Sequence, residues 1–305
     1  MIQKIDCKAV QEQMINEAES LIREAQSISG PLKPVSLGII QVGTDPASDV
    51  YVRNKIRLCE KMGVVATHIK ISDGGVNIHN LYSIVRDTVK NANKRYSGVL
   101  LQLPLPDKLK DSEHDLINVI DSSKDVDGLT NENVGKLWNN EAGVRPCTAA
   151  GIMRIIPKDL SGKKVCIIGR SRLVGKPLAK LCMDRNAAVN VCHTGMDWAD
   201  IGKAARKADI LVVAIGKPKY VNIEPLVDPW KSKIVVDVGI NRDENGKLCG
   251  DIDWSSFYEQ ELDQFVGETV YYTSVPGGVG LLTTGQMILN LAKLYYDEVY
   301  EQYEG

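Results

Sequence analysis

The strongest candidate for chemistry is a pair of side chains in the segment 48–55. Tyr51 and Lys55 stand four residues apart, so on a helix both project from the same face. The tyrosine ring can stack on a flat heterocycle, and a partly buried lysine amine can lose its proton and act as a base. The alternative is an ordinary tyrosine and lysine on a solvated helix surface, and this octapeptide alone does not decide between the two.

Two further polar residues lie where predicted strands end. Gln102 lies at the end of an apolar strand, before the rigid Pro-containing segment, and it is either a site amide or an ordinary loop amide. Asp127 belongs to the turn-rich segment 124–130, at the carboxyl side of a predicted sheet, where open α/β sheets bind ligands. Its carboxylate can pair with a guanidine-like edge of a heterocycle, although Asp-Gly is equally common as a plain turn.

A glycine loop over 169–175 is the candidate cofactor site. It follows an apolar strand and precedes a helix, and backbone N–H groups in this geometry bind phosphate. The Gly-x5-Gly spacing departs from the GxGxxG fingerprint, so a tight turn without a ligand is the alternative. Arg170 adds a cation beside Gly169, and Ser171 adds a hydroxyl. Both favour an anionic ligand.

The end of the next predicted strand distinguishes NADP from NAD. An acidic residue there bonds the ribose 2′-hydroxyl of NAD, whereas arginine accommodates the 2′-phosphate of NADP. The strand ends at 191–195 with Thr194 and no acid, and Asp197 is expected to belong to the following helix. The pattern favours NADP, with NAD as the less favoured alternative.

Alternating strands and helices must position these side chains, and such alternation predicts βαβ units with largely parallel sheets. We therefore expect an α/β protein with a catalytic domain over 1–145 and a Rossmann-like dinucleotide-binding domain over 146–282. Ser48 or Asp49 is expected to cap the helix that carries Tyr51, and Gly30-Pro31 to end the first helix. The predicted strands are 35–42, 64–71, 98–103, 163–168, 188–193, 209–215 and 233–238. The predicted helices are 7–28, 48–62, 77–94, 113–120, 146–157, one with Pro177 in its first turn, 198–208 and 283–303.

The composition excludes several classes of protein. The chain has 305 residues, which suits two domains with sizeable cores, and its 25% of charged residues is an ordinary globular share. The net charge of −2 gives no electrostatic footprint for nucleic acid or an anionic membrane. No apolar run is long enough to span a membrane, and the N-terminus has no secretory signal.

The seven cysteines are widely spaced and form no CxxC motif. We therefore expect reduced thiols in a cytoplasmic protein, not disulfides or a zinc knuckle. The four histidines form no HxxxH pair and are expected to be structural or at the surface. No metal site is predicted.

Six stretches of the chain occur in the order of one known family, although none is specific alone. On these motifs the chain resembles, over nearly its whole length, the bifunctional methylenetetrahydrofolate dehydrogenase/methenyltetrahydrofolate cyclohydrolase (FolD) family. The stretches are 51–55, 98–106, 124–129, 146–148, 169–177 and 276–280.

The resemblance implies a function and an architecture. It implies oxidation of 5,10-methylenetetrahydrofolate to the methenyl form with NADP, then hydrolysis to 10-formyltetrahydrofolate, in one-carbon metabolism that includes purine biosynthesis. It implies that a C-terminal helix over 283–305 returns to the first domain and completes it. It also implies a homodimer.

The resemblance also assigns site residues. Lys55 is the essential base or proton shuttle at the one-carbon bridge, Tyr51 stacks on the folate, and Gln102 holds and tunes the lysine. Asp127 bonds the amino-pyrimidine edge of the pterin. Further substrate contacts are expected from Pro276, Gly277 and Gly278, and cofactor contacts from Thr148, Gly169, Arg170, Ser171, Thr194 and Ile240.

Two places depart from the family pattern. Residues 149–150 are Ala-Ala, where a proline usually follows the threonine, and Leu281 follows Gly280, where the family usually has proline. We expect these departures to affect loop rigidity and the relative activities, not the fold.

Two other functions stay open at this point. The first is a monofunctional, NAD-dependent dehydrogenase of the same fold, against which the retained Lys55 and Gln102 argue. The second is a non-catalytic folate-binding subunit, against which the full set of polar site residues argues.

Overall fold

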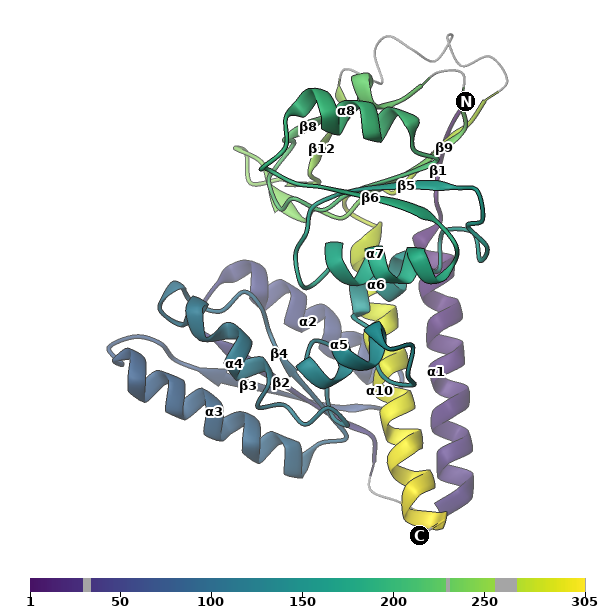
Figure 1. Ribbon diagram of the computed structural model, residues 1–305. Helices are drawn as coiled ribbons and strands as arrows, with labels where there is room; N and C mark the ends of the chain where they lie inside the picture. The colour runs from purple at the N-terminus through teal and green to yellow at the C-terminus, as the bar shows by residue number, and fades with distance from the viewer. Residues whose placement is uncertain (30–33, 229–230, 256–267, 305) are drawn as a thin grey trace. The chain divides into compact units, whose positions relative to one another are not determined.

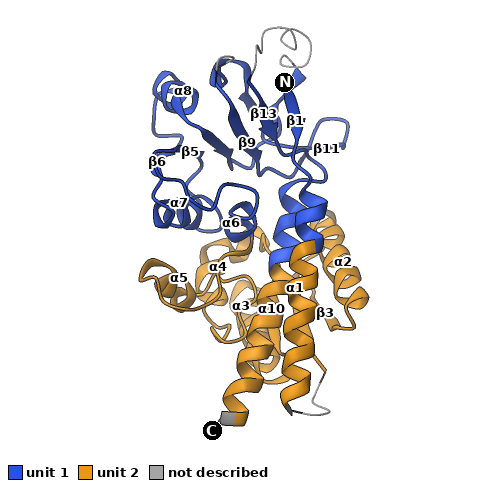
Figure 2. Ribbon diagram, turned by 90° about the vertical axis from the view of Figure 1, so that its right-hand side faces the viewer, with its two compact units in different colours: residues 1–12, 148–286 blue, residues 13–147, 287–305 orange. Residues whose placement is uncertain are grey.

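The structure is a computed structural model that describes residues 1–29, 34–228, 231–255 and 268–304 (Figure 1). The chain divides into two compact units, shown in blue and orange in Figure 2. Unit 1 holds Met1–Glu12 and Thr148–Gln286, and unit 2 holds Gln13–Cys147 and Met287–Gly305. The two boundaries nearest the chain ends fall inside helices, namely α1 (Cys7–Ser29) and α10 (Val279–Glu304).

Unit 2 is built on a parallel sheet with the strand order β3-β2-β4. Its central strand is buried along its whole length, and α2 and α3 supply the crossovers that parallel strands require. One core joins the inner face of α3 to alternate residues of β2 and β4, as helix and strand periods require. The elements are β2 (Ser36–Val42), α2 (Pro46–Lys61), β3 (Val65–Ile71), α3 (Ile78–Arg95) and β4 (Gly98–Leu101).

Short helices and the C-terminal helix complete unit 2. After β4 come η1 (Asp107–Ser112), α4 (Glu113–Ile117) and α5 (Asn131–Trp138). The unit 2 parts of α1 and α10 lie side by side (Figures 1 and 2), and the Tyr296 hydroxyl donates to Glu24 at 3.2 Å. The predicted return of the C-terminal helix is therefore confirmed.

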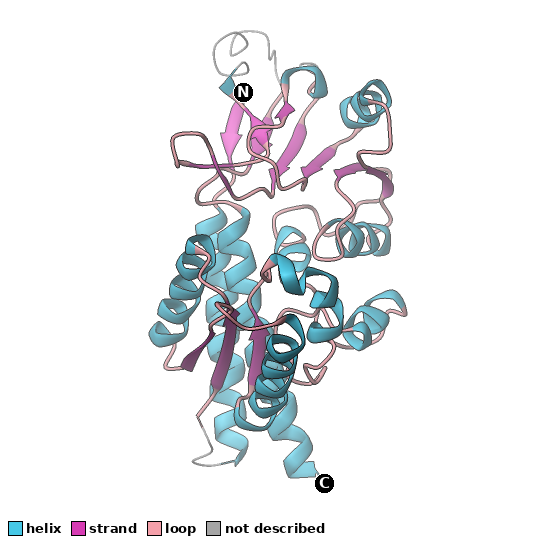
Figure 3. Ribbon diagram, turned by 90° about the vertical axis from the view of Figure 1, so that its left-hand side faces the viewer, coloured by secondary structure: helices cyan, strands magenta, loops and turns pink. Residues whose placement is uncertain are grey.

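Unit 1 contains a parallel sheet with the strand order β1-β13-β9-β7-β5-β6. Its strands are among those drawn in magenta in Figure 3. Helix α8 packs on one face of this sheet and helices α6 and α7 on the other (Figure 1). Alternate residues of β5 and β7 enter the two cores. The strands are β1 (Ile2–Lys4), β5 (Lys164–Ile168), β6 (Ala188–Cys192), β7 (Ile210–Val213), β9 (Lys233–Asp237) and β13 (Val270–Tyr272). The helices are α6 (Cys147–Ile152), α7 (Gly175–Asp184) and α8 (Trp198–Lys207).

The strand order places a topological switch point in unit 1. β5 pairs with β6 on one side and with β7 on the other, so the connections after β5 and β6 diverge. Open α/β sheets bind ligands at such a point, outside the carboxyl ends of the strands. The short elements that follow are β8 (Val221–Asn222), η2 (Glu224–Leu226), β10 (Asn241–Arg242), β11 (Leu248–Cys249) and β12 (Ile252–Asp253).

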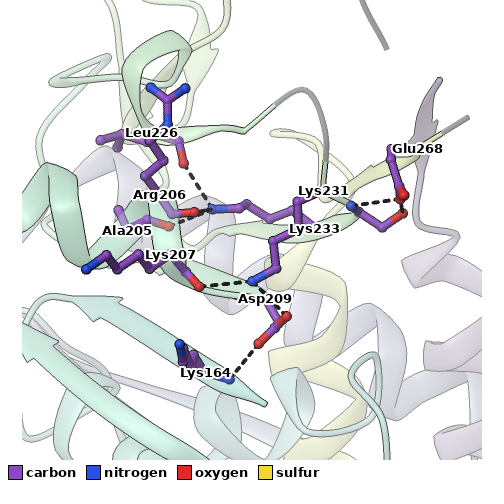
Figure 4. Close-up of polar contacts among 10 residues, drawn as sticks. Lys164, Ala205, Arg206, Lys207, Asp209, Leu226, Lys231, Lys233 and Glu268 are labelled. Carbon is purple, nitrogen blue, oxygen red and sulfur yellow. Dashed lines mark hydrogen bonds and ion pairs between the residues drawn. The ribbon is translucent and has the colours of Figure 1, made fainter. Parts of the chain in front are cut away.

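A buried lysine fastens the end of α8 to the sheet (Figure 4). The Lys233 amine donates to the carbonyl oxygens of Ala205 at 2.5 Å, Leu226 at 3.0 Å and Arg206 at 3.3 Å. The last carbonyls of a helix have few partners within the helix, so Lys233 adds a buried donor at this end, where the Ala205 carbonyl also accepts from the Ala208 N–H at 3.2 Å. Burial, helped by the neighbouring charge of Lys231, lowers the pKa of Lys233 to about 8.

Three sequence-based expectations about these elements need comment. Neither Ser48 nor Asp49 caps α2, because the Asp45 carboxylate accepts hydrogen bonds from the Ser48 backbone N–H and hydroxyl, both at 2.8 Å. The catalytic domain over 1–145 stays a prediction, while residues 1–12 lie in unit 1, where β1 pairs with β13. The predicted helix end at Gly30-Pro31 lies outside the described residues.

No helix in the described ranges combines the length and the apolar character that a membrane span needs.

Candidate active site: a lysine–amide pair and a dinucleotide pocket

The lysine of α2 is buried and bonded to the predicted amide. Lys55 is only 8% exposed, and its Nζ donates to Gln102 Oε1 at 3.0 Å. The Gln102 Nε2 donates to the Leu103 carbonyl at 2.6 Å, which turns the amide oxygen toward the lysine. The Gln102 backbone N–H donates to the Ile40 carbonyl at 2.8 Å and so fixes this residue to the end of the sheet. Lys55 is therefore no solvated surface residue, while Tyr51, one turn earlier, is half-buried.

The two aspartates of the turn after β4 have different environments. Asp125 is 1% exposed, and its carboxylate accepts from Gly128 N at 2.9 Å, Thr130 N at 2.8 Å and Asn133 Nδ2 at 3.0 Å. Burial raises the pKa of Asp125, and the hydrogen bonds from Thr130 and Asn133 oppose this rise. Asp125 is thus the residue that caps the turn, and Asp127 is half-buried beside it.

The buried thiol of Cys147 lies near the charges of both Asp127 and Lys55. Burial raises the pKa of Cys147 well above its usual value, the Asp127 charge raises it further, and the Lys55 charge lowers it. Both charges therefore lie near one sulfur atom. The Cys147 Sγ donates to the Val126 carbonyl at 3.2 Å, and the Cys147 N–H donates to the Asp127 carbonyl at 3.3 Å.

Helix α10 fixes this region through one amide that the sequence analysis missed. The Asn290 Nδ2 donates to the Val126 carbonyl at 2.9 Å and to the Arg145 carbonyl at 3.0 Å. Its side chain is buried, with 2% exposure. An asparagine inside the apolar stretch 287–292 is unusual enough that it could have signalled a buried polar contact.

Unit 1 contains a pocket of about 310 Å³ at the carboxyl ends of β5, β6 and β7. Four predicted cofactor residues line it: Gly169, Arg170, Ser171 and Thr194. The other two predicted cofactor residues, Thr148 and Ile240, lie elsewhere in unit 1. The Thr148 hydroxyl oxygen is 3.1 Å from that of Thr283, and Ile240 lies against Gly280. The pocket also includes residues not predicted for a site: Ile168, His193, Met196, Trp198, Ile201, Ala214, Ile215 and Tyr220. His193, expected to be structural or at the surface, is thus a pocket residue.

In the glycine loop, backbone segments approach one another so closely that a side chain would not fit at two positions. Gly169 has φ +135°, and a Cβ there would overlap the Ala214 carbonyl oxygen. A Cβ on Gly175, the first residue of α7, would overlap the Gly169 carbonyl oxygen. The Ser171 Oγ accepts from Val174 N at 3.1 Å and Gly175 N at 3.4 Å, which leaves its O–H as the group that can donate to an anion. This tight loop at a helix N-terminus fits a phosphate of a dinucleotide.

A buried carboxylate holds the segment after β7, which also lines the pocket. Asp251 is 0% exposed and accepts from the backbone N–H groups of Ile215 at 2.6 Å, Gly216 at 3.0 Å and Lys217 at 3.0 Å. Asp237, at the end of β9, accepts from the Asp251 N–H at 2.9 Å. Burial raises the pKa of Asp237 to about 7. No local sequence pattern predicts the role of Asp251, because its partners are backbone groups about 35 residues away in the chain.

The predicted substrate residues of the second glycine motif belong to unit 1. Gly277 has φ +90°, and a Cβ on Gly278 would overlap the Ser274 carbonyl oxygen, so this turn needs both glycines. The Ser274 hydroxyl donates to the Pro276 carbonyl at 2.9 Å. Leu281 donates its N–H to the Gly278 carbonyl at 3.0 Å, a bond that a proline at this position could not make.

The other departure from the family pattern continues a helix. Ala149 is fully buried within α6, and its carbonyl accepts from the Met153 N–H at 3.1 Å. Among the residues described, no group of three or more His, Cys, Asp or Glu side chains could hold a metal ion.

The fold and these residues define an α/β enzyme that binds a dinucleotide and has a buried lysine–amide pair. Two family profiles match the chain: "Tetrahydrofolate dehydrogenase/cyclohydrolase, catalytic domain" over residues 5–127, and the NAD(P)-binding domain of the same family over 146–299. The bifunctional protein FolD of Lachnoclostridium phytofermentans is 38% identical over 291 residues, which are 94% of this chain and 95% of that protein.

Solved structures agree with these matches. The bifunctional FolD enzyme of Campylobacter jejuni has a TM-score of 0.81 and 32% identity, with 98% of this chain and 100% of that chain covered. The FolD of Trypanosoma brucei, complexed with NADP and an inhibitor, has a TM-score of 0.82 and 26% identity, with 97% of each chain covered. The chain belongs to the tetrahydrofolate dehydrogenase/cyclohydrolase family. The predicted family, the α/β fold class and the two enzyme activities, dehydrogenase and cyclohydrolase, are thereby confirmed.

Proposed function

We propose that this protein oxidises 5,10-methylenetetrahydrofolate with NADP and hydrolyses the resulting methenyl form to 10-formyltetrahydrofolate. The observation that carries the proposal is the buried Lys55 bonded to Gln102, since the hydrolytic step needs a positioned group that handles protons. The retained pair also favours the bifunctional enzyme over a monofunctional dehydrogenase or a non-catalytic folate-binding subunit.

Lys55 acts at the one-carbon bridge of the substrate. Removal of hydride from the methylene carbon leaves a methenyl cation, and a water molecule adds to that carbon. One C–N bond then breaks to give the formyl product, and the reaction releases a proton. Lys55 shuttles protons in these steps, and Gln102 keeps its amine directed at the reacting atoms. Groups of this kind contribute roughly 10²- to 10⁴-fold to a rate.

Tyr51 and Asp127 bind the folate. The half-buried tyrosine precedes Lys55 by one helical turn, so its ring can stack on the folate beside the amine. The Asp125 carboxylate is engaged with the turn, and this leaves Asp127 as the carboxylate suited to the amino-pyrimidine edge of the pterin. Pro276, Gly277 and Gly278 contribute further substrate contacts.

The glycine loop and its neighbours hold NADP, which accepts the hydride when bound. The N–H groups at the start of α7 bind phosphate, with Gly169 and Ser171 shaping the loop. Arg170, an exposed residue that lines the pocket, pairs with the 2′-phosphate, and the Thr194 hydroxyl donates a further hydrogen bond. Asp197 is the N-cap residue of α8. Thr148 and Ile240 complete the cofactor contacts.

The protein acts as a homodimer in the cytoplasm and supplies one-carbon units that include those of purine biosynthesis. β3 supports the homodimer, because it is an edge strand of the unit 2 sheet and its Val65 is 51% exposed. An edge strand leaves a row of backbone N–H and C=O groups with which another chain can pair. Light scattering on the purified protein tests this state, and a monomer at micromolar concentration contradicts it.

One assay tests the proposed function. The protein is mixed with methylenetetrahydrofolate and either NADP⁺ or NAD⁺, while reduced cofactor and methenyl absorbance are followed together. The bifunctional enzyme gives reduced NADP with only transient methenyl absorbance. Methenyl product that accumulates in proportion to reduced cofactor identifies a monofunctional dehydrogenase, and no reduced cofactor at all identifies a non-catalytic protein.

A further inference from the structure

One side of the unit 1 pocket is aromatic, and neither the phosphate nor the ribose accounts for it. Trp198, the first residue of α8, and Tyr220, which directly precedes β8, both line the pocket. Their ring centroids are 5.9 Å apart, and the ring planes meet at 47°. They belong to segments that follow two different strands, β6 and β7, so the fold brings them together at the carboxyl edge of the sheet.

Both rings have a surface that the described chain does not cover. Trp198 is 48% exposed and Tyr220 is 45% exposed, although large aromatic side chains gain most when they are covered. The Lys217 Nζ lies 4.7 Å from the centroid of the Tyr220 ring, and its backbone N–H is held by Asp251 at 3.0 Å. A cation thus lies against the Tyr220 ring, and the aromatic pair presents an apolar surface to the pocket.

The topology indicates which part of a dinucleotide meets this surface. In folds of this class, the strand that follows the glycine-loop helix ends at the adenosine ribose. Here that strand is β6, and the segment after it carries Thr194, Met196 and Trp198 into the pocket. A flat aromatic base stacks well on an indole or phenol ring, so the aromatic surface suits adenine.

We propose that Trp198 and Tyr220 form an aromatic wall on which the adenine ring of the cofactor stacks. This inference rests on the proposed use of NADP, but it concerns residues that the motifs do not assign. Arg170 then binds the 2′-phosphate, while Trp198 and Tyr220 bind the base. Both NAD and NADP contain adenine, so the wall binds either cofactor. It therefore increases the affinity for both and does not determine the preference for NADP.

The test uses adenosine 2′,5′-bisphosphate, which carries the base and the 2′-phosphate but no nicotinamide. Its Kd is measured by calorimetry for wild type, Trp198→Ala, Tyr220→Ala and Trp138→Ala. Trp138 is a matched control because it is 49% exposed and belongs to α5 in unit 2. Loss of one stacked ring should raise the Kd roughly 5- to 100-fold, whereas Trp138→Ala should bind like wild type.

A second readout does not depend on how well the alanine variants fold. The chain has four tryptophans, and a base stacked on Trp198 should quench part of their fluorescence. Quenching by adenosine 2′,5′-bisphosphate should occur in wild type and in Trp138→Phe, and should disappear in the conservative variant Trp198→Phe. Full quenching in Trp198→Phe, or an unchanged Kd in a folded Trp198→Ala, overturns the wall while leaving the proposed cofactor intact. If wild type binds neither this probe nor NADP⁺, the proposed cofactor and the wall both fail.

Discussion

The Lys55 amine donates to the Gln102 side-chain oxygen at 3.0 Å, across 47 residues of chain. Helix α2 supplies the lysine, and the end of β4 supplies the amide, so the sheet of unit 2 fixes both. The variant Gln102→Leu should leave Lys55 buried but without this hydrogen bond. Cyclohydrolase turnover should then fall roughly 10- to 100-fold, because hydrogen bonds to charged groups contribute about 1.5–3 kcal/mol.

A control variant, Gln41→Leu, distinguishes the loss of the Lys55–Gln102 bond from the general effect of removing a buried amide. Gln41 is 1% exposed in the neighbouring strand β2 and donates to Asp49 at 3.0 Å. Gln41→Leu should lower the thermal midpoint as much as Gln102→Leu but keep most of the cyclohydrolase activity. Equal activity losses in the two variants would show that Gln102 acts only through stability.

Removing the Asp127 carboxylate should affect folate binding, whereas removing the Asp125 carboxylate should affect stability. Asp127→Ala should raise the KM for the folate roughly 10- to 100-fold with little change in the free energy of unfolding, because a charged contact to substrate is lost. Asp125→Ala should instead lower the free energy of unfolding, because three buried donors lose their acceptor at about 1–3 kcal/mol each before relaxation. Steady-state kinetics and urea unfolding measure the two quantities, and an unaltered folate KM in Asp127→Ala contradicts its assignment.

Arg170 should decide the preference for NADP⁺ over NAD⁺. The 2′-phosphate adds nearly two negative charges, and the Arg170→Ala variant should bind NADP⁺ roughly 10- to 100-fold more weakly while NAD⁺ is almost unaffected. Arg172→Ala, an exposed arginine two residues later, serves as the control. Competitive titration with both cofactors is the measurement. Equal losses for the two cofactors would place Arg170 on the shared pyrophosphate.

Lys233 should make the stability of the protein depend on pH in the alkaline range. Its pKa is about 8 in the folded protein and 10.5 ordinarily, so between these values the unfolded chain binds more protons. The contribution of this group to the free energy of unfolding therefore rises as the pH increases through that window. Lys233→Met should lower the free energy of unfolding by about 1–3 kcal/mol at neutral pH, since buried carbonyls lose their donor. Urea unfolding at several pH values should show a larger deficit at alkaline pH, and a deficit that shrinks there contradicts the account.

The sequence predicted the elements whose apolar pattern is strong and continuous. The strands β2, β5 and β7 are short apolar runs, and α3 carries its apolar residues at helical spacing, so their observed bounds differ from the predicted ones by one or two residues. Helix α5 was missed because Gly135 and two asparagines weaken its helical signal, although Thr130 caps it by accepting from the Asn133 N–H. The cap of α2 was misplaced because Asp45, Ser48 and Asp49 are all good capping residues.

The candidate site was predictable only in part, for a physical reason. Lys55 and Gln102 are revealed by residue type and by their places on a helix and at a strand end. Asp251 and Asn290 bind backbone groups far away in the chain, and no local pattern encodes such partners. Trp198 and Tyr220 meet only because α8 and β8 begin at the same edge of the sheet.

The central claim is that Lys55 handles protons in the hydrolysis of the methenyl form, and the variant Lys55→Met tests it most directly. Methenyltetrahydrofolate is supplied to the wild-type and variant enzymes, its absorbance decay is followed after correction for the uncatalysed rate, and NADP⁺ binding is titrated on the same samples. The account predicts that hydrolysis falls by roughly 10²- to 10⁴-fold in the variant while the Kd for NADP⁺ stays within about twofold. Undiminished hydrolysis in a folded variant that still binds NADP⁺ would contradict it.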